Sequence, residues 1–347
     1  MPLKPLGLSL LTRILSFFYG IVIMLRNGYY NRVPGSVKKL KHLTVSIGCI
    51  HAGGTGKTPM ALLCAEHFSR KGLTPVFLTR GYKRKSSKPI IVRPGEEKSW
   101  ENIGDEPAML KKNLPDAWLG IGPDRFRNGR NIIENINNKP VFILDDAFQH
   151  RKLGRDIDVV CLPPEPFDDF LIPSGYLREP ISSLGRADII CLIGLEKESV
   201  ILERNRKEIK NLFPEVSVFI LYQTIDRWIN KNTSQTLQTC PFKSPVVVSG
   251  IARPYRFVEL VSESGVTPYK IVNYKDHHAF KATEIEKLNN PMVDGIITTE
   301  KDIMRLSAIN LVNCPNICYL KIKLRFSNSA SEEKFFSLFN RKKTSLS

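Results

Sequence analysis

Short, mostly apolar runs recur along the first two thirds of the chain, and segments with helical spacing separate them. These runs cover 43–47, 76–79, 141–144, 158–162 and 188–193. Runs of this length are typical of strands that are buried on both faces of a parallel sheet. A helix is predicted over 59–68, because Pro59 falls in a first turn, where a missing N–H costs little. The pattern therefore predicts an α/β domain with a parallel sheet.

The character of the sequence changes near residue 225. A polar segment, 230–238, then separates the first domain from a second α/β pattern. Its predicted strands are 246–249, 269–273, 295–299 and 318–323, and its predicted helices are 254–264, 283–289 and 301–309. A chain of 347 residues is long enough for two modest domains. We place them at 31–224 and 225–347, with residues 1–30 as a separate N-terminal segment.

The N-terminal segment carries an uncharged apolar run, 14–25, between Arg13 and Arg26. Twelve residues are too few for a spanning helix, which needs about 20, and an extension back to Leu6 puts Arg13 in the apolar layer. We predict a helix in the membrane interface, with nearby basic residues facing anionic headgroups. Those residues are Arg13, Arg26, Arg32, Lys38, Lys39 and Lys41. The alternatives are a buried core helix, a single-span anchor and a signal peptide, although no small-x-small cleavage site follows.

The loop 48–59 reads Gly-Cys-Ile-His-Ala-Gly-Gly-Thr-Gly-Lys-Thr-Pro and lies between the first predicted strand and helix. Glycines let the backbone wrap a phosphate closely, and the helix N-terminus adds partial positive charge. Lys57 would reach the β- and γ-phosphates of a nucleotide, and the Thr58 hydroxyl would ligate magnesium. The predicted nucleotide-binding residues are His51, Ala52, Gly53, Gly54, Thr55, Gly56, Lys57 and Thr58. His51 stands where this motif usually has glycine, and a plain glycine turn is the alternative.

The run 141–144 ends in two aspartates, Asp145 and Asp146. A buried parallel strand that ends in aspartate supplies the magnesium carboxylate in many phosphate-loop enzymes. Adjacent residues of an extended chain point to opposite sides, so at most one of the two is the ordinary metal carboxylate.

Other polar residues lie at strand ends or helix starts, and each also has a structural interpretation. Arg80 and Tyr82 follow a strand and suit an anionic or sugar ligand, or a solvated basic turn. Asp105 stands where a helix N-cap belongs, so capping competes with catalysis. Glu179 follows an arginine and would form a surface salt bridge of little worth. His277 falls between a strand and a helix, where a surface histidine is the commoner case.

The composition narrows the class of partner. A net charge of +17 indicates a polyanionic partner, either nucleic acid or an anionic membrane, or else a solvated basic surface. A nucleic-acid ATPase would need stacking aromatics among the basic residues, and only Tyr82 qualifies weakly. A regulatory NTPase switch would need a guanine-reading Asn-Lys-x-Asp loop, which is not evident. The seven scattered cysteines, with no Cys-x-x-Cys pair, are typical of a reduced intracellular protein without structural zinc.

The order of motifs over nearly the whole chain resembles the tetraacyldisaccharide 4′-kinase family, the lipid A 4′-kinases of Gram-negative bacteria. The matching motifs are 53–59, 80–82, 104–107, 145–150, 177–180, 249–254, 276–278 and 299–302. The motifs 145–150 and 250–254 are far more specific than the phosphate loop. Three residues, Cys49, His51 and Ala147, depart from the family pattern. Ala147 stands where glycine is usual and restricts the turn after Asp146 unless its φ is negative.

The resemblance implies transfer of the ATP γ-phosphoryl group to the 4′-hydroxyl of tetraacyldisaccharide 1-phosphate, which gives the 1,4′-bisphosphate, lipid IVA. It places the enzyme at the cytoplasmic face of the inner membrane, with an anionic membrane surface and the lipid A precursor as partners and no nucleic acid. The alternative function is a basic P-loop ATPase that acts on nucleic acid. The expected fold is a P-loop NTPase-like parallel-sheet domain, a smaller α/β domain and an N-terminal membrane-associated helix.

The resemblance also implies site roles. The cofactors are ATP and Mg²⁺, and Thr58 and Asp145, helped by Glu179, would hold the metal. Asp105 would be the base, His277 from the second domain would orient it, and Lys57 would neutralise phosphate charge. Our hypothesis for the sugar–phosphate cleft is a lining of Arg80, Tyr82, Arg125, Asp146, Gln149 and Arg178.

Overall fold

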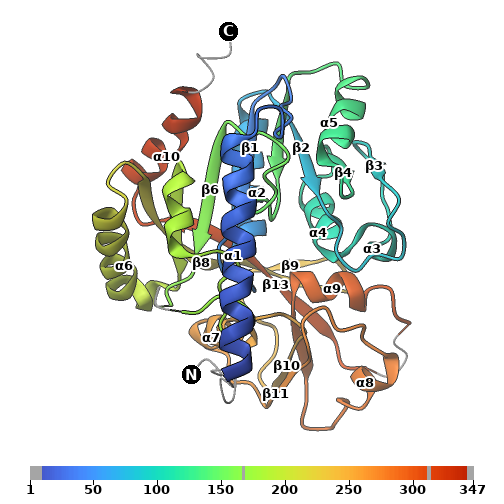
Figure 1. Cartoon of the computed structure of the whole chain (residues 1–347). Coiled ribbons are helices and arrows are strands. Elements are labelled where there is room, and N and C mark those ends of the chain that lie inside the picture. Colours follow the sequence, from blue (N-terminus) through green and yellow to red (C-terminus); the bar gives the residue numbers. More distant parts are fainter. Residues whose placement is uncertain (1–9, 166–168, 311–313, 342–347) are drawn as a thin grey trace. The chain divides into compact units, whose positions relative to one another are not determined.

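The computed structural model describes residues 10–165, 169–310 and 314–341, and the chain divides into two compact units (Figure 1). Unit 1 takes its residues from Met1–Thr79, Pro123–Tyr222 and Phe326–Ser347. Unit 2 consists of Arg80–Gly122 and Gln223–Arg325. Two strands, β8 (Ser217–Asn230) and β13 (Ile317–Phe326), run from one unit into the other.

The core of unit 1 is a parallel sheet in the order β2-β5-β1-β6-β7-β8. Its other strands are β1 (Thr44–Gly48), β2 (Thr74–Thr79), β5 (Pro140–Leu144), β6 (Ile157–Leu162) and β7 (Ile189–Gly194). The helical elements of this unit are α1 (Leu10–Arg32), α2 (Lys57–Arg70), α5 (Arg125–Ile133), η1 (Ile181–Arg186), η2 (Glu196–Glu198), α6 (Ser199–Leu212) and α10 (Ser329–Arg341). Because β1 and β5 pair in parallel, with Ser46 opposite Leu144, the loops that follow them leave the same edge of the sheet.

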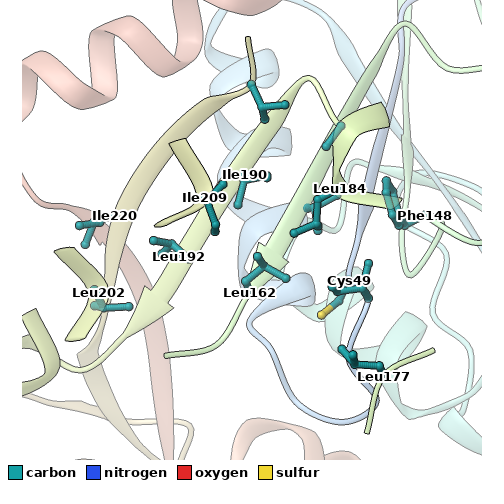
Figure 2. Packing of buried hydrophobic residues seen from close by; sticks show 14 of the residues in the cluster. Cys49, Phe148, Leu162, Leu177, Leu184, Ile190, Leu192, Leu202, Ile209 and Ile220 are labelled. Carbon is teal, nitrogen blue, oxygen red and sulfur yellow. The ribbon is translucent and has the colours of Figure 1, made fainter. Parts of the chain in front are cut away.

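Side chains from three strands and one helix build a large part of the unit 1 core. Figure 2 shows Leu202 and Ile209 of α6 against Ile190 and Leu192 of β7 and Ile220 of β8. Leu162, Leu184, Leu177, Phe148 and Cys49 belong to the same buried cluster. Burying a side chain of this size contributes about 1.5–3 kcal/mol, so the cluster holds the strand ends that carry the polar loops in place.

Unit 2 contains a smaller parallel sheet, β11-β10-β12-β13, followed by the second half of β8. Its strands include β10 (Pro245–Ser249), β11 (Lys270–Asn273), β12 (Gly295–Thr299), the short β9 (Thr236–Leu237) and the antiparallel pair β3 (Ile90–Val92) and β4 (Trp118–Ile121). Its helices are α3 (Trp100–Ile103), α4 (Asp105–Asn113), α7 (Pro254–Glu263), α8 (Ala282–Glu286) and α9 (Glu300–Leu306). Helix α4 packs against α9, and the Asn113 amide donates to the Glu300 carboxylate at 2.8 Å.

The α/β fold class predicted from the sequence is confirmed, and most predicted strands match observed ones within two residues. The units do not follow the predicted boundaries 31–224 and 225–347, because residues 80–122 belong to unit 2 and residues 326–341 to unit 1. The chain leaves unit 1 inside β8, whereas we expected the division at the polar segment 230–238. The second half of β8 is rich in polar residues, a composition that is also typical of a linker.

Helix α1 is longer than the predicted run, with 23 residues from Leu10 to Arg32. At 1.5 Å per residue it is about 35 Å long. Within the described residues it is the one helix long and apolar enough to cross a membrane. Only Ser16 and Ile23 of α1 are buried, while Leu10 is 76% and Phe17 67% exposed, so the buried core helix is the wrong alternative.

One polar face of α1 docks on unit 1. The Ser16 hydroxyl donates to the Leu171 carbonyl at 2.8 Å, and the Tyr19 hydroxyl donates to the Arg178 carbonyl at 2.9 Å. About two turns further on, the Asn27 amide donates to Glu179 at 3.0 Å. The polarity of α1 is thus the reverse of an ordinary surface helix, because its polar groups face the protein and its apolar groups face outward.

The basic residues near α1 do not all face outward as predicted. Arg26 contacts Glu179 at 3.3 Å, and the Lys39 ammonium lies 2.8 Å from Asp156. Arg13 lies over the Phe170 ring. These side chains found internal partners on segments far away in the sequence, which the local charge pattern does not reveal.

Candidate active site

The phosphate loop connects the end of β1 to the start of α2, as predicted. Gly53 and Gly56 have φ of 97° and 79°, in the left-handed region that glycine adopts without strain. The first half of the loop is tied down by backbone bonds, from the Ala52 N–H to the Tyr176 carbonyl at 2.7 Å and from the Arg178 N–H to the Ile50 carbonyl at 2.6 Å. Because Gly56 is the N-cap of α2, no side chain caps its first turn, an arrangement that suits an anion at the helix N-terminus.

A cluster of charged side chains lies beside the loop in unit 1. The Lys57 ammonium is 3.6 Å from Asp146, and the Arg178 guanidinium donates to both oxygens of the same carboxylate at 2.9 and 3.0 Å. Burial alone would raise the pKa of Asp146, but Lys57 and Arg178 outweigh it and hold that pKa well below its ordinary value. The carboxylate therefore stays ionised and keeps both cations at the phosphate loop.

The turn after β5 accommodates the departure at position 147. Asp146 adopts the left-handed conformation with φ of 47°, whereas Ala147 is not among the residues of positive φ. Asp tolerates this region better than most residues, so the alanine causes no strain. The close approach falls on Gly48 instead, where an added Cβ would lie 2.4 Å from the Phe148 Cβ.

Asp145 and Thr58 supply oxygen ligands of the kind that magnesium prefers. Asp145 is 2% exposed and directly follows β5, while Thr58 lies in the first turn of α2, after the adjacent strand β1. The Arg125 guanidinium donates to the Asp145 carbonyl at 2.8 Å and so fixes the backbone there. The carboxylate and the hydroxyl of this pair fit a magnesium ion. Arg125, which we expected to line the substrate cleft, is buried and contacts the end of β5.

Glu179 is fully buried and contacts the C-terminal half of α1. Its carboxylate accepts from Arg186 at 2.9 Å, from Arg26 at 3.3 Å and from Asn27 at 3.0 Å. Burial raises the pKa of Glu179, but these donors outweigh it, so the pKa is lowered overall. Both oxygens are engaged, and these contacts do not support a place for Glu179 in the magnesium shell; they also replace the surface salt bridge that the sequence suggested.

Gln149 has a role in the loop itself. Its side-chain amide donates to the Cys49 carbonyl at 3.0 Å, and the Cys49 sulfur accepts from the His51 N–H at 3.1 Å. His51 and Cys49, the two departures at the loop, are both buried. These residues thus shape the backbone of the loop, and of the predicted cleft residues in unit 1 it is Asp146 and Arg178 that lie together with Lys57.

Asp105 and His277 lie together in unit 2. The Nδ1 atom of His277 is 2.8 Å from Oδ2 of Asp105, and the Glu106 N–H donates to Oδ1 of Asp105 at 2.9 Å. Burial raises the pKa of Asp105, but the His277 hydrogen bond and the charge of Lys301 outweigh it and lower that pKa. The predicted boundaries put the two residues in different domains, and the structure corrects this because both belong to the same unit.

The surroundings of His277 include residues that sequence reasoning did not assign. Lys301 contacts His277, Glu106 and Asp276, and Arg305 lies 3.7 Å from Asp105. Tyr82 is 56% exposed, and its ring centroid is 5.4 Å from that of His277, while Arg80 is exposed. Lys301 falls in the motif 299–302, one of the motifs that carry the family resemblance. Thr299 does cap α9, and its hydroxyl accepts from the Asp302 N–H at 3.0 Å.

The parallel sheet of unit 1, with a glycine loop, Lys57 and a carboxylate on the next strand, defines a P-loop enzyme of the phosphoryl-transfer class. Unit 2 adds a carboxylate–histidine pair of the type that removes a proton from a hydroxyl. The chain belongs to the tetraacyldisaccharide-1-P 4′-kinase family, whose model matches residues 8–340.

Individual relatives and a solved structure support the same family. The tetraacyldisaccharide 4′-kinase of Syntrophus aciditrophicus is 31% identical over 94% of this chain and 91% of its own length. That of Aquifex aeolicus is 29% identical over 94% of this chain and 96% of its own. A crystal structure of LpxK from Aquifex aeolicus in complex with ATP matches with a TM-score of 0.75 and 28% identity, over 94% of this chain and 97% of that one.

Proposed function

We propose that this enzyme transfers the γ-phosphoryl group of ATP to the 4′-hydroxyl of tetraacyldisaccharide 1-phosphate. The product is the 1,4′-bisphosphate, lipid IVA, an intermediate of lipid A biosynthesis. The observation that carries the proposal is the family match over residues 8–340. The glycine loop supports it, because Gly53 and Gly56 have positive φ and no side chain caps the first turn of α2.

The nucleotide side of the reaction falls to unit 1. Residues 51–58 would hold the triphosphate, with Lys57 neutralising charge on the β- and γ-phosphates. Thr58 and Asp145 would hold Mg²⁺, which neutralises phosphate charge when bound. Asp146 and Arg178 support this arrangement, because their contacts keep the Lys57 ammonium beside the loop.

The acceptor side falls to unit 2. A sugar hydroxyl must lose its proton as it attacks, so a carboxylate positioned within hydrogen-bond reach is expected. We assign this role to Asp105, oriented by the hydrogen bond to His277 at 2.8 Å. Arg80 and Tyr82 of the same unit would bind the sugar–phosphate part of the acceptor.

The four acyl chains explain the need for a membrane helix. Each buried methylene contributes about 0.8 kcal/mol, so the lipid stays in the bilayer and the enzyme must reach it there. The outward apolar residues of α1, among them Phe17, Phe18 and Leu25, support contact with the bilayer. We assign the enzyme to the cytoplasmic face of the inner membrane, where ATP is available, and the charge of +17 suits its anionic surface.

The test is thin-layer chromatography of products formed from γ-labelled ATP and tetraacyldisaccharide 1-phosphate. The expected result is a labelled lipid that requires Mg²⁺, and its absence would end the kinase assignment. A parallel reaction with single- and double-stranded oligonucleotides checks the nucleic-acid alternative, for which stimulated ATP hydrolysis would be the positive result. Fractionation of nuclease-treated cells tests the membrane assignment, since an enzyme found wholly in the soluble fraction would refute it.

A further inference from the structure

The His277 ring is held between two partners of opposite chemistry. Its Nδ1 lies 2.8 Å from Oδ2 of Asp105, and its Nε2 lies 3.2 Å from the Lys301 ammonium. The side chains of His277 and Lys301 are 12% and 18% exposed, so water has little access to either contact. Asp276 also approaches Nε2, but at 3.8 Å it is beyond hydrogen-bond distance.

A lysine ammonium can only donate hydrogen bonds, because its nitrogen has no lone pair. Nε2 of His277 must therefore accept from Lys301 and cannot itself carry a hydrogen. The single ring hydrogen of a neutral imidazole then sits on Nδ1, where it points at Asp105. A protonated imidazolium would place a second N–H directly against the ammonium, which both sterics and charge oppose.

The ammonium form of Lys301 is well supported. Its Nζ lies 3.2 Å from Glu106 and 3.6 Å from Asp276. Burial lowers the pKa of Lys301, but Glu106, Asp105 and Asp276 outweigh it and raise that pKa above its ordinary value. Lys301 therefore remains a cation throughout the range in which an imidazole titrates.

We propose that Lys301 is a positioning residue that locks His277 in the Nδ1–H tautomer, so that His277 donates to Asp105 and leaves Asp105 as the proton acceptor. This inference rests on the proposed kinase function. It assigns the direction of the hydrogen bond between His277 and Asp105. Glu106, the neighbour of Asp105, takes part because it holds Lys301 in place.

The backbone supports the same arrangement. His277 adopts a left-handed conformation with φ of 59°, and its N–H donates to the Gly250 carbonyl at 3.0 Å. A strained residue of this kind persists where its surroundings fix it, and such residues cluster at functional sites. Lys301 stands in the first turn of α9, whose N-cap Thr299 is itself fixed by Asp302.

The proton balance of the transfer follows from this tautomer. As the sugar oxygen forms its bond to the γ-phosphorus, the bond from that phosphorus to the ADP oxygen breaks. The hydroxyl proton passes to the Asp105 carboxylate, which becomes a carboxylic acid and later releases the proton to water. His277 keeps its own hydrogen on Nδ1 throughout, because Lys301 occupies Nε2.

The tautomer can be read directly by NMR on the full-length enzyme labelled with ¹⁵N in its histidine rings. The chain has six histidines, so the His277 signals are assigned by their loss in His277→Gln. We expect a protonated-type Nδ1 and an unprotonated-type Nε2 near neutral pH in the wild type. An Nε2–H tautomer or an imidazolium at that pH would overturn the proposal without any reference to activity.

Substitution of Lys301 gives the second readout. Lys301→Met should convert the His277 signals to a mixture of tautomers, while Lys301→Arg, which keeps a donor, should retain Nδ1–H. In the labelled-lipid assay, kcat of Lys301→Met should fall roughly 10- to 100-fold, a part of what a positioned base contributes, with KM for ATP unchanged.

Lys287→Met is the matched control, because Lys287 is exposed on the same unit and should leave both tautomer and kcat unchanged. If Lys301→Met keeps the wild-type tautomer, or keeps normal kcat at every pH, the inference fails while the kinase function stands. If the wild type makes no labelled lipid, the proposed function fails. The NMR experiment still determines the tautomer of His277, because it does not depend on activity. Should Lys301→Met not fold, the wild-type spectrum and Lys301→Arg still decide the question.

Discussion

The contacts of Glu179 predict that it anchors α1. Glu179→Gln keeps the shape of the side chain but removes its charge, so Arg186 and Arg26 lose their anionic partner. Removing one member of a buried ion pair costs about 3–5 kcal/mol. Arg186 and Arg26 are 21% and 32% exposed, so water can solvate both, and we expect the lower end of this range, about 3 kcal/mol.

Hydrogen–deuterium exchange is the suitable assay, because a two-unit protein does not give a single unfolding free energy. If the free energy is lost from the docking of α1, the amides of α1 should exchange about 100-fold faster in Glu179→Gln, while those of α10 stay the same. Glu203→Gln is the matched control, since Glu203 forms an exposed pair with Arg206 and should change exchange little.

A magnesium titration of kinase activity separates anchoring from metal binding. With Glu179 as an anchor, the Mg²⁺ concentration for half-maximal activity should be the same in wild type and Glu179→Gln. Unchanged α1 exchange combined with a raised Mg²⁺ requirement would refute our reasoning and return Glu179 to the magnesium shell. The lowered pKa of Glu179 also predicts a pH dependence. The stability that Glu179 contributes is present above the ordinary carboxyl pKa and is lost as the pH falls toward the folded-state pKa.

Three further predictions concern unit 1. Burial, with Arg125 and Arg155 nearby, lowers the pKa of His150 to about 4, below its ordinary value of 6.5. The unfolded chain therefore binds the proton first, so hydrogen–deuterium exchange of the most protected unit 1 amides should show their opening free energy falling by about 3 kcal/mol from pH 6.5 to 4, and His150→Gln should flatten that slope. Gly48→Ala should destabilise the enzyme by at least about 1–3 kcal/mol in the same assay, because the added methyl would overlap Phe148. Asp146→Asn keeps a residue that tolerates the left-handed turn but frees Lys57 and Arg178; kcat should fall at least about tenfold without loss of thermal stability, and normal turnover would contradict our view of the cluster.

Local patterns predicted much of the fold. The apolar runs located β1, β2, β5, β6 and β7, because a strand buried on both faces has few polar positions. No strand was predicted over β8, although its first half is largely apolar; in its second half Gln, Thr, Asp and Arg stand among apolar residues. The same rule also did not separate the units, since residues 80–122 join unit 2 through contacts that chain order does not encode.

The candidate site divides in the same way. Lys57, Thr58 and Asp145 could be predicted because strand, loop and helix follow one another in sequence. The Asp105–His277 pair was expected only from a family resemblance, since the two residues are 172 positions apart. Lys301, to which the sequence assigned no role, lies 3.2 Å from His277 in the folded unit although 24 positions separate the two residues.

The sequence by itself determined that this protein is an α/β phosphoryl-transfer enzyme with an apolar N-terminal helix, because periodicity and glycine loops are local properties. The tertiary structure decided which charges meet. It gave Glu179 to α1 and Lys301 to His277, and it aimed the apolar side of α1 away from the protein. Charges in water are screened beyond about 10 Å, so only the folded arrangement of distant segments brings these charges close enough to interact.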